Sequence, residues 1–427
     1  MYKTKIFFLV ACAVNLFYLF LTFIFFYFLE SPLMNINEND YLSFHYAGMN
    51  ILQDLPNLYN STLSPFPFRY LPIAAYFFTP FSLMGLEFGY FTFQIFNLFL
   101  NILTIYLFFK IIQIYKVSND NSEISFNLQY FNDIFNKPEN ESILHHYAVF
   151  LIMLPQFMNY FLGQINLLVC VLILASLFYF LKDNVKSDIL GGILLGLGIS
   201  IRPTLILILP FLLILTYDKN TKKIKFNLKK SVLRILGSII LLIISGLYFL
   251  IYPQMLSDFV KVNLTGEYTY AIDSGIEINP SFSLTRIILI FLELIRVEIN
   301  GFLIFIIITL LFFIPIYFYY IQNNYQPFKL INGFLAGILI LLMVYFDSWP
   351  HHLLIIMPFL IFFILFNKKF KHHKWIKYLY YLMAILMVIF WGIFYLTYSF
   401  FPFNLGGLIL LILLYSSLLL YFATTVR

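Results

Sequence analysis

Long apolar segments set the strongest limit on how this chain folds. Runs of hydrophobic residues with few charges recur along its length, beginning with 5–29, and one membrane-spanning helix needs about 20 such residues. The sequence is 62% hydrophobic and 11% charged, which lies far outside the range of soluble domains. The sequence therefore predicts a polytopic membrane protein.

Helices are expected rather than a β-barrel, because the apolar runs are continuous and do not alternate with a period of two. Helices also satisfy their own backbone hydrogen bonds in lipid. Cys12 and Cys170 both fall in apolar segments, so neither a disulfide framework nor a thiolate metal site is indicated. We expect an all-α fold that forms a single integral-membrane domain over residues 1–427.

Clusters of lysine and arginine orient the predicted spans, because cytoplasmic loops carry an excess of these residues. The positions that we place inside are Lys3, Lys5, Lys110, Lys116, Lys182, Lys186, the run 219–230, Lys329 and the cluster 368–377. An even number of crossings between successive clusters gives roughly twelve spans. These are 5–29, 87–112, 144–160, 165–181, 188–201, 204–217, 231–252, 300–321, 331–346, 353–367, 377–399 and 405–424. Both termini are predicted to be cytoplasmic, in a multi-pass protein of the cell membrane.

The first outer loop, 30–86, is predicted to carry surface helices instead of another span. Apolar residues recur at helical spacing over 41–55, which is typical of an amphipathic helix on a membrane surface. If 70–84 crossed the membrane, the basic residues at 110–116 would lie outside, against the charge rule. We therefore expect 70–84 to be re-entrant or interfacial, and 253–299 to form a second outer loop.

Several pieces of the sequence, in order, carry a resemblance to a known family. They are NENDYLSFHYAGMNIL, LPNLYN, FRYLPIAAYFFTPFSLMG, FLGQINLLVCVLIL, GGILLGLGISIRPTLILILPFLL, INPSFSLTR and FDSWPHHLLIIMPFL. Spread from Asp40 to Phe359, they resemble the polyprenyl-phosphate-mannose-dependent mannosyltransferases typified by the phosphatidylinositol mannoside enzymes. That family is similar to the integral-membrane glycosyltransferases of the GT-C class. The resemblance implies many spans and an outer first loop whose surface helices carry a catalytic acid.

Asp40 falls at the catalytic carboxylate of this family, so the resemblance implies that it is the base that deprotonates the acceptor hydroxyl. A lipid-phosphate leaving group departs without strong acid assistance. One base and cations near the phosphate therefore suffice for an inverting single displacement. The alternative role is a helix N-cap, because Asp is favoured at the start of a helix. The two roles are not exclusive, and Glu38 and Asp54 are alternative carboxylates nearby.

Three further residues are candidates to contact the donor phosphate. His351 matches the histidine of the family's Trp-x-His element, with Trp349 before it, and the adjacent His352 leaves open which histidine acts. The alternative is a Trp and His that anchor a helix end at the interface. Arg202, followed by Pro203, matches a basic residue and proline in the family pattern. Phosphate is a natural partner for such a cation, and a snorkelling arginine or a structural ion pair is the alternative.

Polar and aromatic side chains near these positions are candidates for substrate binding. They are Tyr41, Tyr59, Tyr70, Gln164, Asn166, Asn279, Ser281 and Trp349. The amides and the hydroxyl could bind sugar hydroxyls, although hydrogen bonds between helices are their more common use in membranes. The tyrosines either stack on a sugar or lie at the membrane interface.

No metal ion or other cofactor is expected. No Asp or Glu pair has metal-ligand spacing on the predicted outer face, and the histidines lack a zinc arrangement. The net charge of +6 follows from the basic clusters of the cytoplasmic side and indicates anionic lipid rather than nucleic acid. The expected partners are a polyprenyl or dolichyl phosphate sugar, a glycolipid or glycan acceptor, and membrane lipids.

Three functions remain open. The favoured function is transfer of a hexose, by resemblance mannose, from a polyprenyl or dolichyl phosphate carrier to a lipid-linked or cell-surface glycan. The second is a related GT-C enzyme that uses another sugar or a protein acceptor. The third is a lipid or solute transporter or flippase, for which polar residues or broken helices at the bilayer midplane and internal repeats are expected. The ionisable residues instead gather at one predicted face, which favours chemistry at a membrane surface.

Overall fold

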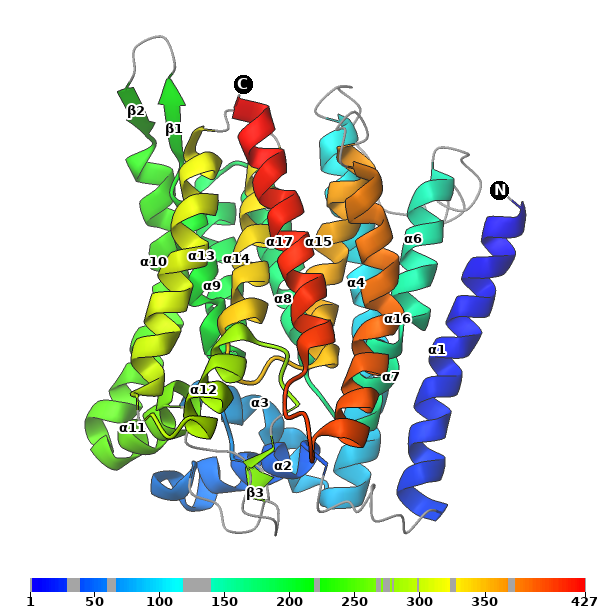
Figure 1. Cartoon of the computed structure of the whole chain (residues 1–427), viewed down its shortest axis with the longest axis vertical. Helices are drawn as coiled ribbons and strands as arrows, with labels where there is room; N and C mark the ends of the chain where they lie inside the picture. Colours follow the sequence, from blue (N-terminus) through cyan, green and yellow to red (C-terminus); the bar gives the residue numbers. More distant parts are fainter. Residues whose placement is uncertain are drawn as a thin grey trace.

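The computed structural model describes residues 2–28, 39–59, 67–117, 140–218, 223–265, 270–271, 277–278, 280–297, 299–322, 328–367 and 373–426. Helices make up most of these residues, and the long ones run from one end of the molecule to the other (Figure 1). The prediction of an all-α membrane fold is therefore confirmed.

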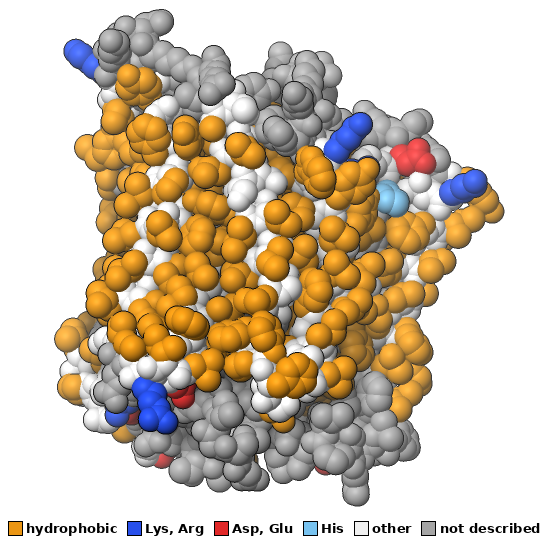
Figure 2. Space-filling view, in the orientation of Figure 1, with side chains coloured by type: hydrophobic (Ala, Val, Ile, Leu, Met, Phe, Trp, Pro, Cys, Tyr) orange, Lys and Arg blue, Asp and Glu red, His pale blue; other side chains and the backbone are white. Residues whose placement is uncertain are grey.

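Six of the described helices are long and apolar enough to cross a membrane. They are α1 (Tyr2–Phe28), α4 (Leu86–Val117), α10 (Leu228–Ile251), α13 (Gly301–Gln322), α16 (His373–Thr397) and α17 (Leu405–Val426). Many of their large apolar side chains are exposed, and hydrophobic side chains form a broad band across the middle of the face shown in Figure 2. Such a surface is expected where lipid, not water, surrounds the protein.

The other predicted spans correspond to shorter elements. These are α6 (Glu141–Ile152), α7 (Leu154–Phe161), α8 (Asn166–Leu181), α9 (Val185–Ile201), the 3-10 helix η4 (Pro203–Leu212), α14 (Lys329–Val344) and α15 (Leu353–Phe366). The chain bends by 118° between α7 and α8, and counting this bent pair as one span raises the number of candidate spans to seven. By length and composition, the described residues support six or seven spans and do not establish the predicted twelve.

The segment 204–217 differs from the prediction of a span. It forms η4 and then strand β1 (Leu215–Asp218), which pairs in antiparallel register with β2 (Lys223–Phe226). A 3-10 helix rises about 2 Å per residue, so the 10 residues of η4 extend about 20 Å. Because η4 packs against α9, α10 and α14, it lies within protein, where a helix need not match the thickness of the bilayer.

Both termini lie at one end of the bundle, and helices α2 (Tyr41–Gln53) and α3 (Pro72–Leu83) lie at the opposite end (Figure 1). These two helices have 13 and 12 residues, fewer than the roughly 20 that a span requires. They pack against each other, with the rings of Phe44 and Phe78 stacked at a centroid distance of 4.5 Å. The first loop therefore forms short helices, as predicted from its pattern.

Several short elements complete the end that carries α2 and α3. They are η2 (Leu55–Asn57), α11 (Pro253–Val260), the π-helix η5 (Lys261–Thr265), the strand pair β3 (Tyr270–Ala271) and β4 (Glu277–Ile278), α12 (Leu284–Leu294) and η6 (Pro350–His352). Most of them belong to the predicted second outer loop. This end of the molecule thus carries several short helices besides α2 and α3.

Helices α9 and α10 pack closely because glycines line their contact. A Cβ atom on Gly192 would lie 2.5 Å from the carbonyl oxygen of Arg234, and one on Gly237 would lie 2.6 Å from that of Ile189. Small residues allow helix backbones to approach in this way. A buried ion pair between Arg234 Nε and Asp188 Oδ1, at 2.7 Å, joins the same two helices. This contact holds α9 in place, and Arg202 follows directly at its end.

Candidate active site

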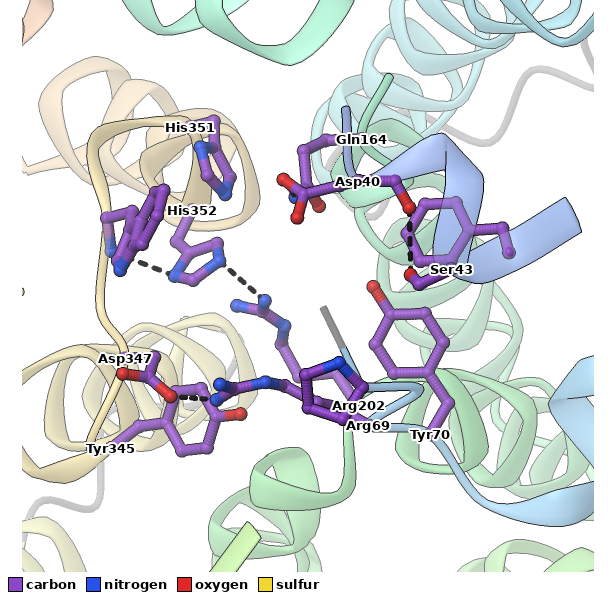
Figure 3. Close-up of a pocket in the computed structure, with 13 residues that line it drawn as sticks. Asp40, Ser43, Arg69, Tyr70, Gln164, Arg202, Tyr345, Asp347, His351 and His352 are labelled. Atoms are coloured by element: carbon purple, nitrogen blue, oxygen red, sulfur yellow. Dashed lines mark hydrogen bonds and ion pairs between the residues drawn. The ribbon is translucent and has the colours of Figure 1, made fainter. Parts of the chain in front are cut away.

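A pocket lies at the end of the bundle that carries α2 and α3, and it gathers residues from distant parts of the sequence (Figure 3). The predicted site residues that line it are Asp40, Tyr70, Gln164, Arg202, Trp349, His351 and His352. Asp40 and Gln164 lie on one side, the two histidines lie on the other, and Arg202 lies between them. The tertiary structure therefore brings the proposed base together with the proposed phosphate contacts.

Asp40 directly precedes α2, but its side chain forms no capping hydrogen bond. The backbone N–H of Tyr41 instead donates to the side-chain oxygen of Asn39 at 2.8 Å. The backbone oxygen of Asp40 accepts from the Ser43 hydroxyl at 2.8 Å. The alternative role of Asp40 as a side-chain cap is therefore not what the structure shows, and its carboxylate is directed into the pocket.

The side-chain amide of Gln164 donates a hydrogen bond to Asp40 Oδ2. Gln164 follows Gly163, which has a φ of +63° at the bend between α7 and α8. A Cβ atom on Gly163 would lie 2.5 Å from Asn39 Oδ1 and 2.8 Å from Tyr41 Cβ. Glycine is required here both by the left-handed backbone and by the close approach of the first loop, so this bend brings Gln164 to Asp40.

Buried amides hold the backbone of the same bend. The side chains of Asn97 on α4 and Asn159 on α7 each donate to the carbonyl oxygen of Gln164, both at 3.2 Å. The Asn166 amide donates to Asn159 Oδ1 at 3.4 Å. Deeper in the bundle, Asn101 on α4 contacts Gln156 on α7 through hydrogen bonds of 3.4 and 2.9 Å. These bonds satisfy buried polar groups and limit movement of the residue that contacts Asp40.

Arg202 ends α9 and has 7% of its surface exposed. Its guanidinium lies 5.8 Å from the centroid of the Tyr345 ring. No carboxylate within the described ranges forms an ion pair with it, and its Nη1 has no hydrogen-bond partner there. The alternative of a structural ion pair is therefore not supported among these residues. A buried guanidinium of this kind suits an anionic ligand with paired oxygens.

His352 lies between Trp349 and Arg202. The backbone N–H of Trp349 donates to its Nδ1 at 3.0 Å, and Arg202 Nη2 lies 2.7 Å from its Nε2. A neutral imidazole has one lone pair that accepts, so only one of these contacts is a hydrogen bond. The 2.7 Å contact is a hydrogen bond when Nε2 accepts from Arg202. When Nδ1 accepts from Trp349 instead, Nε2 carries a proton, and His352 and Arg202 both present N–H donors to the same space. An oxyanion is the group that two such donors would bind together.

His351 is also buried, with 1% of its surface exposed. Its ring meets that of His352 edge-on at a centroid distance of 4.4 Å. Its Nδ1 has no hydrogen-bond partner in the described part of the chain. Both histidines therefore belong to the pocket, and His352 has the direct contact with Arg202.

Arg69 and Asp347 line the pocket but were not among the predicted site residues. They form an ion pair, and Arg286 Nη2 also lies 3.3 Å from Asp347 Oδ1. Two guanidinium groups thus share one carboxylate beside the pocket. Arg69 lies within FRYLPIAAYF, so the argument applied to Arg202, a cation in an apolar setting, would have identified it from the sequence. Asp347 lies in the piece FDSWPHHLLIIMPFL, between the predicted spans 331–346 and 353–367.

Tyr41 and Tyr59, both proposed as substrate contacts, do not line the pocket. Tyr41 is 2% exposed and packs against Tyr90 at a centroid distance of 5.4 Å. The Tyr59 hydroxyl donates to the backbone oxygen of Tyr70 at 2.7 Å. The Tyr41 side chain packs in the core, and the Tyr59 side chain helps to position Tyr70. The sequence pattern did not predict this, because an amphipathic pattern does not reveal which buried face of a helix meets a pocket.

Asn166 and Ser281 also lie outside the pocket lining, and Asn279 lies outside the described residues. Asn166 bonds to another helix, the alternative use considered for it. The Ser281 hydroxyl oxygen accepts from the backbone N–H of Ser348 at 2.9 Å. It therefore joins the second outer loop to the segment that carries Trp349 and the histidines.

Burial raises the pKa of Asp40 to about 6, although the hydrogen bond from Gln164 and the charge of Arg69 act to lower it. Burial, with the nearby charge of Arg202, holds the pKa of His351 and His352 well below their usual range. At neutral pH Asp40 is therefore mostly ionised and the histidines are neutral. A carboxylate with a pKa just below the working pH is suited to act as a general base.

No group of three or more His, Cys, Asp or Glu side chains is arranged to hold a metal ion among the residues described. Independence from metal ions remains a prediction. The groups available for charge stabilisation in the pocket are the guanidiniums and imidazoles of the chain itself.

Comparison with known proteins gives one family match. The model of glycosyltransferase family 87 matches residues 68–344, well over half of the chain. The matched range contains Arg69, Gln164 and Arg202, whereas Asp40 and the two histidines lie outside it. Neither the curated proteins nor the solved structures include a match to the chain. The chain therefore belongs to glycosyltransferase family 87 and is a membrane glycosyltransferase.

Proposed function

We propose that this protein transfers a hexose, mannose by the resemblance of its motifs, from a polyprenyl or dolichyl phosphate to a lipid-linked or cell-surface glycan. The observation that carries the proposal is one pocket that holds both the Asp40 carboxylate and the buried Arg202 guanidinium. Asp40 is the base that acts on the acceptor. Arg202 and His352 contact the phosphate of the donor.

The transfer is an inverting single displacement. Asp40 accepts the proton of the acceptor hydroxyl while that oxygen attacks the anomeric carbon from the face opposite the phosphate. The bond between the anomeric carbon and the phosphate oxygen breaks, and its electron pair leaves with the lipid phosphate. The N–H groups of Arg202 and His352 stabilise the negative charge that grows on this leaving group.

The active site is proposed to face the outside of the cell membrane, with both termini in the cytoplasm. Strand β2, which carries Lys223 and Lys225 of the basic run, lies at the end of the molecule that carries the termini (Figure 1). Cytoplasmic loops are enriched in such residues. The pocket lies at the other end and is therefore assigned to the outer side.

Two alternatives follow from the same pocket. A different sugar or a protein acceptor would need the same base and the same phosphate contacts, so the geometry alone does not distinguish them. A transporter or flippase is less well supported, because the chain belongs to a glycosyltransferase family. The buried amides between α4 and α7 donate to each other and to backbone groups, so these hydrogen bonds are accounted for as contacts between helices, and Asn97 Oδ1 alone of this group has no partner among the described residues.

The test is transfer of labelled mannose from polyprenyl phosphate mannose in membranes that contain the wild type or Asp40→Asn. We expect a loss of about 100-fold or more, the usual contribution of a general base. Asp54→Asn is the matched control, because Asp54 is an exposed carboxylate at the end of α2 and should leave transfer unchanged. Normal transfer by Asp40→Asn would remove Asp40 as the base. Absence of transfer from any lipid-phosphate sugar would favour the transport function.

The acceptor is to be identified by incubating lipid extracts with the enzyme and labelled donor. An acceptor that gains one hexose with the wild type, but not with Asp40→Asn, would establish the class of product. Gain of label by protein instead of lipid would favour the alternative of a protein acceptor.

A further inference from the structure

A second cavity, of about 330 Å³, lies beside β1, at the end of the bundle opposite the candidate active site. Three cationic side chains line it: Lys230 and Arg234 from α10, and Lys329 from the start of α14. The donor-phosphate contacts of the active site play no part in this cavity. It is a separate feature of the end that carries the termini.

Lys329 is the buried member of this group, with 5% of its surface exposed. Its ammonium donates to the backbone oxygens of Leu215, at 2.6 Å, and Ile321, at 3.4 Å. It also lies 5.0 Å from the centroid of the Tyr320 ring. No carboxylate in the described part of the chain forms an ion pair with Lys329. Carbonyl dipoles satisfy its donors in part but do not neutralise its charge.

The other two cations already have carboxylate partners. Arg234 forms its buried ion pair with Asp188 of α9. Lys230 pairs with Asp183, whose side chain is 73% exposed, so this pair is accessible and weak. Within the described residues, three positive charges thus meet two negative charges, and Lys329 carries the charge that remains uncompensated.

We propose that this cavity binds a phosphate-bearing anion, with Lys329 as the central contact and Lys230 as a second contact at the opening. The uncompensated charge of Lys329 favours an anionic ligand, and the cavity lies at the start of α14, at the end of the bundle that carries the termini. Basic pockets between membrane helices bind anionic headgroups. The shared chemistry is a phosphate group, supplied either by an anionic lipid or by free phosphate.

The experiment uses the full-length protein in nanodiscs of phosphatidylcholine with phosphatidylglycerol, followed by native mass spectrometry of the lipid that stays bound. We expect the wild type to retain phosphatidylglycerol in preference to phosphatidylcholine. Lys329→Gln and Lys230→Gln should each weaken this retention about fivefold, the ratio that corresponds to about 1 kcal/mol per basic residue. Lys329→Arg keeps the charge and should keep the lipid.

Lys186→Gln is the matched control, because Lys186 is an exposed lysine near the start of α9 that does not line the cavity. If Lys329→Gln fails to fold, Lys230→Gln carries the test. In that case, equal retention of phosphatidylglycerol by Lys230→Gln and Lys186→Gln would overturn the proposal. The proposal would also be overturned if the wild type retained the two lipids equally and inorganic phosphate did not stabilise it.

A second arm measures the thermal unfolding of the delipidated protein in detergent with added inorganic phosphate. A stabilisation that is lost in Lys230→Gln or Lys329→Gln, together with no preferred lipid, identifies free phosphate as the ligand. Preferred retention of phosphatidylglycerol identifies the lipid. If neither arm shows an effect that depends on these lysines, the cavity is not an anion site.

Discussion

At the scale of single residues, the environment of Asp40 sets its chemistry. The hydrogen bond from Gln164 and the positive charge of Arg69 both lower the pKa of the carboxylate, yet burial has the larger effect and raises this pKa to about 6. With a raised pKa, Asp40 keeps its proton up to a higher pH than an exposed Asp does. The unprotonated form that acts as a base is therefore lost as the pH falls through about 6. The activity should therefore have an acid limb that reports this group.

The pH dependence of transfer tests this assignment. We expect kcat/KM to rise about tenfold per pH unit below pH 6 and to level off above it, because one proton must leave Asp40 before it acts as a base. Gln164→Leu removes the hydrogen bond that lowers the pKa, so its acid limb should shift to higher pH. If the acid limb does not move in Gln164→Leu, the ionisation that it reports is not that of Asp40.

Arg202 provides a second test at this scale. Arg202→Gln removes the charge and should raise the KM for the lipid-phosphate donor and reduce kcat/KM about 100-fold, the usual loss for one transition-state donor. Arg202→Lys keeps the charge but not the planar pair of donors, so its loss should be smaller. Kinetics with purified enzyme measure both. Similar kcat/KM for Arg202→Gln and the wild type would exclude a contact with the phosphate.

At the scale of elements, the bend between α7 and α8 determines whether the site is assembled. Gly163 combines a φ of +63° with contact to the first loop, whereas Gly85 has a φ of +83° and nothing within 4 Å of an added Cβ. Both positions need glycine for their left-handed backbone, but only Gly163 also needs it because a Cβ would collide with the first loop.

Gly163→Ala and Gly85→Ala form a matched pair. Both should lose about 1–2 kcal/mol of stability, because a Cβ disfavours the left-handed conformation, and Gly163→Ala should lose more than Gly85→Ala, because its Cβ would also meet Asn39 and Tyr41. Gly163→Ala alone should also displace Asn39 and Tyr41, and with them Asp40, so transfer should fall strongly in this variant and remain near normal in Gly85→Ala. Thermal unfolding and transfer measured on both variants check this. Equal transfer by the two variants would show that the bend does not position Asp40.

At the scale of the whole molecule, the proposed topology places the end with α2 outside the cell and the end with the termini in the cytoplasm. Asn57 is exposed at the end with α2, and Lys186 is exposed near the end with the termini. In a background in which Cys12 and Cys170 are replaced by Ala, we expect an impermeant thiol reagent to label Asn57→Cys on intact cells. Lys186→Cys should be labelled after the cells are opened. The reverse pattern would place the active site in the cytoplasm.

Much of the architecture could be predicted at this scale because it depends on local composition. Apolar length and continuity predict helices in lipid, since every backbone group must be satisfied within its own segment. The short helices α2 and α3 were also expected, from helical spacing and from the charge rule. The 3-10 geometry of η4 was not, because it depends on the neighbours that enclose this segment.

The sequence by itself therefore determined that this chain is a helical membrane protein and pointed to Asp40, Arg202 and the two histidines through the resemblance of their motifs to a known family. Only the tertiary structure decided that these side chains share a pocket, that Asn39 rather than Asp40 bonds to the start of α2, and that Arg69 pairs with Asp347 beside them. Hydropathy is a property of each segment, whereas the direction of a side chain depends on how each helix is rotated against its neighbours. That rotation is set by packing between residues far apart in the sequence.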